Sequence, residues 1–167
     1  NEIEAETLGV GQGAAARDIA VLRRPGAEPG LFWLGGFASD MRGSKAEALD
    51  AYAARTGRAF TRFDYSGHGA SGGTFAEGTI SRWLEEALTV FGRTEGPQVV
   101  VGSSMGGWLA LLLTEAHRAA VGPAASRVAG LVLIAPAVDM TRALMFDTMT
   151  RKEKATLKAE GAVRQAS

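Results

Sequence analysis

The fold is decided by residues 99–108, which read Val99-Val100-Val101-Gly102-Ser103-Ser104-Met105-Gly106-Gly107-Trp108. The β-branched run is typical of a buried strand, and the apolar residues after Gly107 are typical of a helix packed on a sheet. Between them lies Gly-x-Ser-x-Gly, a pattern in which the serine occupies a tight turn from strand to helix. Side chains at 102 and 106 would collide in such a turn. We therefore expect Ser104 to project its hydroxyl from the sheet edge as a nucleophile.

The short pattern becomes specific through its placement between a strand and a helix, because the bare pattern also arises by chance. Ser103 is the weaker candidate, since choosing it leaves no flanking pair of glycines. The alternative is a glycine-rich turn with two incidental serines. A helix that begins directly after Ser104 would direct its N-terminal amides at the site and favour an oxyanion there.

A second strand ends in a pair of glycines, Gly35 and Gly36, followed by Phe37. The carboxyl ends of parallel strands meet at one edge of a sheet, so this turn should lie near Ser104. Acyl transfer places negative charge on the carbonyl oxygen, which two backbone N–H groups can stabilise. We expect Phe37 and Met105 to supply those two groups. An ordinary tight turn is the alternative.

The rest of the chain alternates strand and helix patterns. Strands are predicted at residues 2–8, 19–23, 31–34, 59–63, 99–101 and 130–134, the last four as continuous apolar runs of buried parallel strands. Helices are predicted at 45–56, 80–91 and 108–119, with Ala46, Leu49 and Ala53 on one face of the first and Ile80, Leu84, Leu88 and Phe91 on one face of the second. This order predicts the α/β class, a doubly wound and mostly parallel sheet with helices on both faces.

The chain changes character at Met140, where Met, Lys, Arg and Glu become frequent. We interpret residues 1–139 as the N-terminal part of the core, truncated after the sixth strand, and residues 140–167 as the start of a helical lid. Glycines at 9, 11 and 13 predict a flexible turn. Neither these nor Gly35 and Gly36 have the spacing of a nucleotide-binding loop.

Few residues could act as the general base for a serine nucleophile, because the chain contains only two histidines. His117 lies thirteen residues along the helix that leaves Ser104, about 20 Å away at 1.5 Å per residue, too far for a general base. His68 follows a strand that should not neighbour the nucleophile strand, so a structural role is expected for it. Asp64 should bond backbone N–H groups of its own loop, and Asp139 stays open as a candidate acid.

Three segments together, residues 37–46, 62–67 and 96–108, carry a resemblance to the α/β-hydrolase superfamily. Within it, the chain is similar from about residue 31 to 136 to the family of α/β-hydrolase domain-containing protein 10. That family includes a mitochondrial palmitoyl-protein thioesterase and acyl-glucuronide esterase. The resemblance implies Ser104 as nucleophile, Phe37 and Met105 as oxyanion donors, an acid after a later strand and a histidine near the C-terminus.

Composition excludes several other functions. Eighteen basic and eighteen acidic residues balance, so nucleic acid is not expected as a partner. Cysteine is absent, which excludes thiolate metal sites and a cysteine nucleophile.

No apolar run reaches the length of a membrane span, and the first residues lack a signal-peptide pattern. We expect a cytoplasmic enzyme, or a mitochondrial one if a leader was removed, with no metal or organic cofactor.

These observations predict a serine hydrolase of esterase or thioesterase type that acts on small-molecule acyl substrates. The triad acid and histidine are expected outside residues 1–167, so this chain alone should be nearly inactive. The apolar strand at 130–134 would be a bare edge, so a C-terminal segment or a second chain should complete the sheet. The alternative is an inactive hydrolase-like module that binds an acyl ligand or a protein.

Overall fold

The computed structural model describes residues 5–161 and divides into two units, residues 1–137 and 138–167. The first unit contains strands β1 (Glu6–Val10), β2 (Arg17–Arg24), β3 (Ala27–Leu34), β4 (Arg58–Phe63), β5 (Gln98–Ser103) and β6 (Val128–Ile134). It also contains helices α1 (Ser44–Thr56), α2 (Ile80–Gly92) and α3 (Met105–Val121). The second unit contains a π-helical turn (Thr141–Phe146) and α4 (Arg151–Glu160), which the non-helical residues 147–150 separate.

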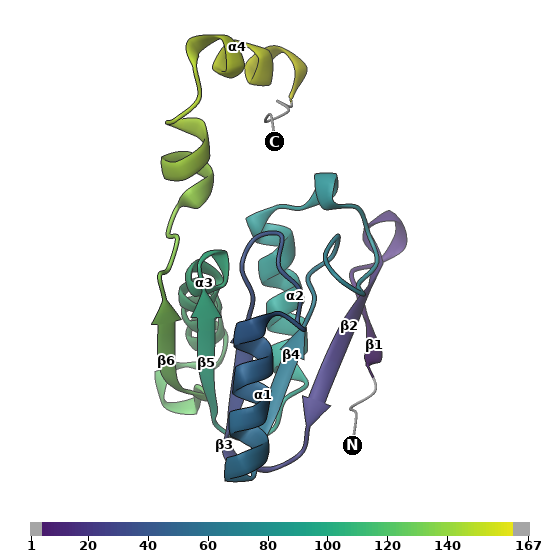
Figure 1. Ribbon diagram of the computed structural model, residues 1–167, viewed down its shortest axis with the longest axis vertical. Helices are drawn as coiled ribbons and strands as arrows, with labels where there is room; N and C mark the ends of the chain where they lie inside the picture. Colours follow the sequence, from purple (N-terminus) through teal and green to yellow (C-terminus); the bar gives the residue numbers. More distant parts are fainter. Residues whose placement is uncertain (1–4, 162–167) are drawn as a thin grey trace. The chain divides into compact units, whose positions relative to one another are not determined.

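The six strands form one sheet in the order β1-β2-β4-β3-β5-β6 (Figure 1). The two pairs that involve β2 are antiparallel, and β4, β3, β5 and β6 are parallel. The predicted mostly parallel sheet is confirmed. Because β3 lies between β4 and β5, the segment after β4 is two strands away from the nucleophile strand, as the sequence predicts.

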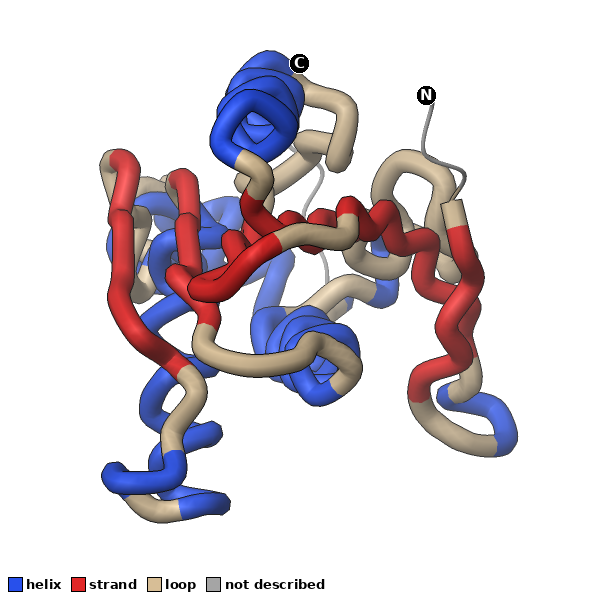
Figure 2. The backbone as a smooth tube through the Cα atoms, turned by 90° about the horizontal axis from the view of Figure 1, so that it is seen from below, coloured by secondary structure: helices blue, strands red, loops and turns tan. Residues whose placement is uncertain are grey.

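Helices cover both faces of the sheet (Figure 2). On one face, α1 packs Ala46 and Ala53 against Trp33 and Phe60 of β3 and β4. On the other face, α3 packs on β5 and α2 packs on α3, and the ring of Phe32 meets that of Phe91 edge to face at 5.3 Å. Residues 32 and 33 therefore point to opposite faces, as alternate residues of a strand must.

Two strands begin more than two residues away from their predicted starts. The predicted strand at 2–8 begins at Glu6 and includes Gly9, while residues 1–4 lie outside the described part. The strand predicted at 31–34 extends further toward its N-terminus, because β3 begins at Ala27 and includes Pro29. The pairing of β3 with β4 changes register between Ala27 and Leu31, and such an irregularity tolerates a proline that cannot donate to the ladder.

The buried face of α2 is not the one predicted. Leu84 and Leu88 are only half-buried and line a shallow surface groove. The buried residues are Trp83, Glu86, Ala87, Val90 and Phe91, and of these only Phe91 lies on the predicted face. A pattern of apolar residues could not reveal this rotation, because the helix buries a carboxylate, Glu86, which bonds the buried Arg17 of β2.

β6 lies at the edge of the sheet, as expected for the strand at 130–134 within residues 1–167. Leu131 and Val132 are exposed, and none of its residues is fully buried. Among residues 5–161, no helix is both long enough and apolar enough to cross a membrane.

Candidate active site

Ser104 lies at the turn from β5 to α3, with φ 55° and ψ −119°. A positive φ is costly for a residue with a side chain, and strain of this kind concentrates at functional sites. Backbone hydrogen bonds hold the turn: the Ser104 N–H donates to the carbonyl of Ile134, and the Ser104 carbonyl accepts from Gly107 and Ala137. The side chain of Ser104 is exposed while that of Ser103 is buried.

The glycines around Ser104 fill places where a side chain does not fit. A Cβ on Gly102 would lie 2.6 Å from the carbonyl carbon of Gly106. A Cβ on Gly106 would lie 2.5 Å from the carbonyl oxygen of Gly35, and one on Gly107 would lie 2.7 Å from Cβ of Pro136. Because β5, α3 and the end of β3 approach this closely, the backbone after β3 reaches the nucleophile.

The loop after β3 lies directly against Ser104. A Cβ built on Gly36 would be 3.5 Å from the Cβ of Ser104. Within residues 5–161, the N–H groups of Phe37 and Met105 donate to no backbone carbonyl. The next residue, Ala38, has φ 55°. Two N–H groups without a backbone acceptor thus flank the serine, that of Met105 at the start of α3 and that of Phe37 in the loop after β3.

His68 holds the loop after β3 in position. Its Nε2 accepts the N–H of Ala38 at 3.2 Å, and its Nδ1 lies 3.1 Å from the carbonyl of Ser66. His68 is buried. Both ring nitrogens are engaged with backbone groups, which is the structural role that the sequence predicts.

Asp64 bonds one backbone N–H of its own loop, as predicted, and a second one in the loop after β3. Its Oδ1 accepts the N–H of Met41 at 2.6 Å, and its Oδ2 accepts the N–H of Ala70 at 2.8 Å. The loop after β4 is therefore tied to the loop after β3 at two points, Asp64 and His68. These bonds fix the backbone that carries the Phe37 N–H.

Sequence reasoning missed the buried ion pair beneath these loops. Glu86 accepts from Arg17 Nε at 2.5 Å, from the Ser66 N–H at 2.8 Å and from the Ser66 hydroxyl at 2.6 Å. Trp83 Nε1 donates to the Ser66 carbonyl, the same oxygen that His68 approaches. A chain of hydrogen bonds thus links the ion pair, through Ser66 and His68, to Ala38. A glutamate on a helix gave no sequence signal for this role.

An aromatic cluster borders the site on one side. The ring of Phe37, which is 39% exposed, packs against Phe75 at 5.0 Å and Trp83 at 6.1 Å between centroids. Phe75 is also exposed. Phe37, which lines the pocket beside Ser104, thus belongs to a partly exposed aromatic cluster.

His117 has a structural environment far along α3. Its Nε2 accepts the N–H of Arg127 at 3.2 Å, and its ring meets Phe91 edge to face at 5.0 Å. Burial, and then the positive charge of Arg127, lower the pKa of His117 below its ordinary value. It is a structural acceptor, in agreement with its exclusion as a base.

This environment makes stability depend on pH. Because folding lowers the pKa of His117, the folded state favours the neutral ring. The resulting stabilisation is complete above the unfolded pKa of about 6.5 and is lost as the pH falls from there through the folded pKa. We expect the free energy of unfolding, measured in urea, to fall over this window more steeply for wild type than for His117→Asn. Parallel curves for the two proteins would contradict the prediction.

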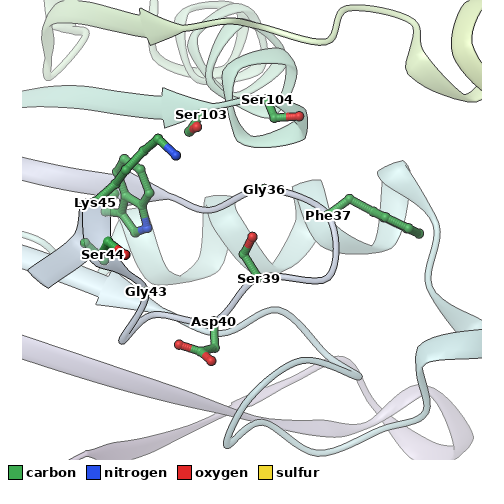
Figure 3. Close-up of a pocket in the computed structure, with 11 residues that line it drawn as sticks. Gly36, Phe37, Ser39, Asp40, Gly43, Ser44, Lys45, Ser103 and Ser104 are labelled. Atoms are coloured by element: carbon green, nitrogen blue, oxygen red, sulfur yellow. The ribbon is translucent and has the colours of Figure 1, made fainter.

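A pocket of about 450 Å³ opens beside Ser104 (Figure 3). It is lined by Ser103 and Ser104, by the loop after β3 and by the first turn of α1, including Ser39, Asp40, Ser44 and Lys45. The Lys45 amine points toward Ser103. Sequence analysis named Lys45 only as the start of a helix. Across residues 5–161, no three His, Cys, Asp or Glu side chains are grouped to hold a metal ion.

Comparisons with known proteins identify the family of this chain. The family model described as serine aminopeptidase, S33, matches residues 36–164. The mitochondrial palmitoyl-protein thioesterase ABHD10 of mouse is 40% identical over 139 residues, which are 81% of this chain and 44% of that protein. The human protein of the same name is 37% identical and covers 73% of this chain and 38% of its own length.

Two solved structures are similar over nearly the whole chain. A putative hydrolase from Agrobacterium vitis superposes with a TM-score of 0.90 at 46% identity, covering 100% of this chain and 65% of its own. Mouse α/β-hydrolase domain-containing protein 10 superposes with a TM-score of 0.80 at 33% identity, covering 95% and 59%.

The chain spans less than half the length of the curated relatives it matches. The names of these relatives say that they are mitochondrial, so the comparisons give no support to the cytoplasmic compartment expected first. The family model, the relatives and the solved structures agree on the family and the fold. This chain belongs to the serine aminopeptidase S33 family of α/β-hydrolases and resembles ABHD10 within that fold.

Proposed function

We propose that the natural gene product carrying this chain hydrolyses carboxylic esters or thioesters, with Ser104 as the nucleophile. The observation that carries the proposal is the strained, exposed serine at the start of α3, with φ 55°. Ser104 Oγ attacks the carbonyl carbon and loses its proton to a base, and the alcohol or thiol leaves with a proton. Water then cleaves the acyl-enzyme by the reverse roles.

The Phe37 and Met105 N–H groups are the proposed donors to the oxyanion. Both are without a backbone acceptor within residues 5–161, and they flank Ser104 from two different elements. Each such donor contributes about 3 kcal/mol to the transition state in enzymes of this kind. His68 positions the loop donor through Ala38.

The base and the acid are proposed to come from residues outside 1–167. Both histidines of the chain already bond backbone groups, His68 at Ala38 and His117 at Arg127. Asp139, which follows β6 with φ 55°, remains a second candidate for the acid. A histidine from another segment or a second chain would take the proton from Ser104.

The same additional residues are proposed to cover the exposed edge of β6. Leu131 and Val132 present apolar surface there, and an open parallel edge favours pairing with a further strand. We also propose that residues 140–167 begin a lid. The name of the mouse relative, a palmitoyl-protein thioesterase, supports an acyl thioester as one substrate class.

A fluorophosphonate probe tests the nucleophile directly. In the natural gene product, we expect stoichiometric labelling at Ser104, located by peptide mass spectrometry, and loss of labelling and of thioester hydrolysis in Ser104→Ala. Ser103→Ala is the matched control, because Ser103 is the buried neighbour, and it should still be labelled.

Labelling that persists in Ser104→Ala would reject the proposal. A folded wild-type protein that neither reacts with the probe nor hydrolyses esters would favour the alternative, a hydrolase-like module that binds without catalysis. The two results are distinguishable, because in the first a residue other than Ser104 reacts with the probe, whereas in the second no residue reacts and no ester is hydrolysed.

A further inference from the structure

A tight turn at residues 36–39 carries the proposed oxyanion donor of Phe37 (Figure 3). The Ser39 N–H donates to the Gly36 carbonyl at 3.2 Å and closes the turn, with Phe37 and Ala38 at its centre. Ala38 has φ 55°, a left-handed conformation that glycine usually occupies in a turn of this kind. The Gly36 carbonyl and the Phe37 N–H belong to one planar trans peptide. The bond that fixes this carbonyl therefore also fixes the direction of the Phe37 N–H.

The side chain that holds this turn is His68, and its two bonds determine which ring nitrogen carries the proton. Its Nε2 lies 3.2 Å from the Ala38 nitrogen, and a backbone N–H can only donate. Its Nδ1 lies 3.1 Å from the Ser66 carbonyl oxygen, which can only accept. Nε2 must therefore be unprotonated, and Nδ1 must carry a proton. Of the two neutral tautomers and the imidazolium, only the neutral Nδ1–H form makes both bonds.

Aromatic side chains surround the ring of His68, which is 5% exposed. The rings of Tyr65, Phe75 and Trp83 lie 5.7, 5.2 and 5.2 Å from it, centroid to centroid. The Tyr65 hydroxyl is neutral, because burial, followed by the charge of Glu86, raises its pKa well above the ordinary value. An imidazolium at this position would face apolar rings in place of water, which disfavours the charged form.

Acidic residues on the four segments around the ring are engaged with other partners. These residues are Asp40 in the loop after β3, Asp64 in the loop after β4, Glu77 beside Phe75, and Glu85 and Glu86 on α2. The cations of the region are Arg17 and Arg82, which are paired with these glutamates, and Arg42, which is exposed. Among residues 5–161, no carboxylate forms an ion pair with His68. Protonation of His68 therefore adds a buried charge that no described residue pairs with.

We propose that His68 positions the turn at 36–39 only as a neutral ring, and that its protonation releases the turn and slows the reaction of Ser104. This deepens the proposed function and rests on it for the effect on Ser104. A proton taken up from water by Nε2 places two N–H donors, that of the ring and that of Ala38, against each other. The bond that holds Ala38 in its left-handed conformation is then lost, and the Phe37 N–H loses its fixed direction.

Nitrogen-15 spectra of the histidine rings in the natural gene product test the tautomer without requiring catalysis. The spectrum of His68→Gln assigns the ring signals of His68 by their loss. At neutral pH we expect a proton on Nδ1 and none on Nε2. On acidification, the backbone amide signals of Phe37 and Ala38 should move with the same midpoint as the His68 ring. The ring of His117 is the control, because it bonds Arg127 and makes no bond to the turn, so its midpoint should not appear in those signals.

Two outcomes of these spectra would overturn the proposal. The first is a proton on Nε2 of His68 at neutral pH. The second is a pair of Phe37 and Ala38 amide signals that stay in place while the His68 ring takes up its proton.

Two variants of the natural gene product connect the turn to the nucleophile. His68→Phe keeps a ring but removes the acceptor, and it should slow fluorophosphonate labelling of Ser104 at neutral pH by between roughly tenfold and the hundredfold that loss of one oxyanion donor costs. His68→Gln offers an amide oxygen to Ala38 and does not titrate, so it should recover most of the rate.

The pH profile separates this role from a merely structural one. The labelling rate of wild type divided by that of His68→Gln should fall by roughly tenfold or more as His68 is protonated. The division cancels the titration of the triad histidine, which both proteins share. A ratio that is constant with pH would overturn the proposal. Absence of labelling in wild type, with the amide signals still following the His68 ring, would overturn only the proposed function.

Discussion

Gly106→Ala is expected to destabilise the chain by about 3 kcal/mol or more and to disrupt the turn from β5 to α3 at Ser104. The new Cβ would lie 2.5 Å from the carbonyl oxygen of Gly35 and closer still to that of Leu34. Both oxygens belong to the backbone at the end of β3, so rotating a side chain cannot relieve the clash. Overpacking of this kind costs about 1–3 kcal/mol where neighbours relax and more where they do not. Urea unfolding followed by circular dichroism measures the loss.

Gly92→Ala is the matched control for this prediction. Gly92 is the last residue of α2, it is exposed, and a Cβ there meets nothing within 4 Å. Alanine is favoured over glycine in a helix by up to about 1 kcal/mol, so Gly92→Ala should be neutral or stabilising. If Gly106→Ala were equally benign, β3 and α3 would not approach as closely as described. The oxyanion geometry proposed for Phe37 would then lose its support.

Sequence patterns were sufficient for most of the fold because each element carries its own local signal. The apolar runs identified β4, β5 and β6 to within two residues of their ends, and the predicted helices overlap α1, α2 and α3. What failed depended on tertiary contacts. The buried face of α2 is set by the partner of Glu86 on another strand. The start of β3 at Ala27 depends on its pairing with β4, which changes register between Ala27 and Leu31.

The features of the site also fall into two groups, those with a local sequence signal and those that depend on tertiary contacts. Ser104, the glycines around it and Asp64 were predictable, because a tight turn and a backbone-bonding carboxylate leave local patterns. The positioning bond from Ala38 to His68 and the pocket between Trp33 and Lys45 were not. These features join residues that are distant in sequence, so only the folded arrangement brings them together. The roles of Phe37 and Met105 remain a prediction that the probe experiments address.

Glu86→Ala should cost about 3–5 kcal/mol, the range for removing one partner of a buried ion pair. The side chain of Glu86 is fully buried, and that of Arg17 is nearly so. Loss of the carboxylate leaves the guanidinium and the Ser66 N–H and hydroxyl without their buried acceptor. Because Ser66 supports His68 and His68 supports Ala38, the loop that carries Phe37 should also loosen. Urea unfolding measures the loss of stability, and the rate of fluorophosphonate labelling measures the effect of the loosened loop on Ser104.

Glu85→Ala provides the comparison that makes the argument specific. Glu85 bonds the same guanidinium at 2.7 Å, but its side chain is 55% exposed and makes no bond to Ser66. Solvent screens an ion pair of this kind, so its removal should cost about 1 kcal/mol or less. If both variants lost the same stability, the pair would act only as a surface charge contact. A large loss confined to Glu86→Ala, with slower labelling of Ser104, would mean that a carboxylate buried beneath the loops holds the catalytic backbone in place.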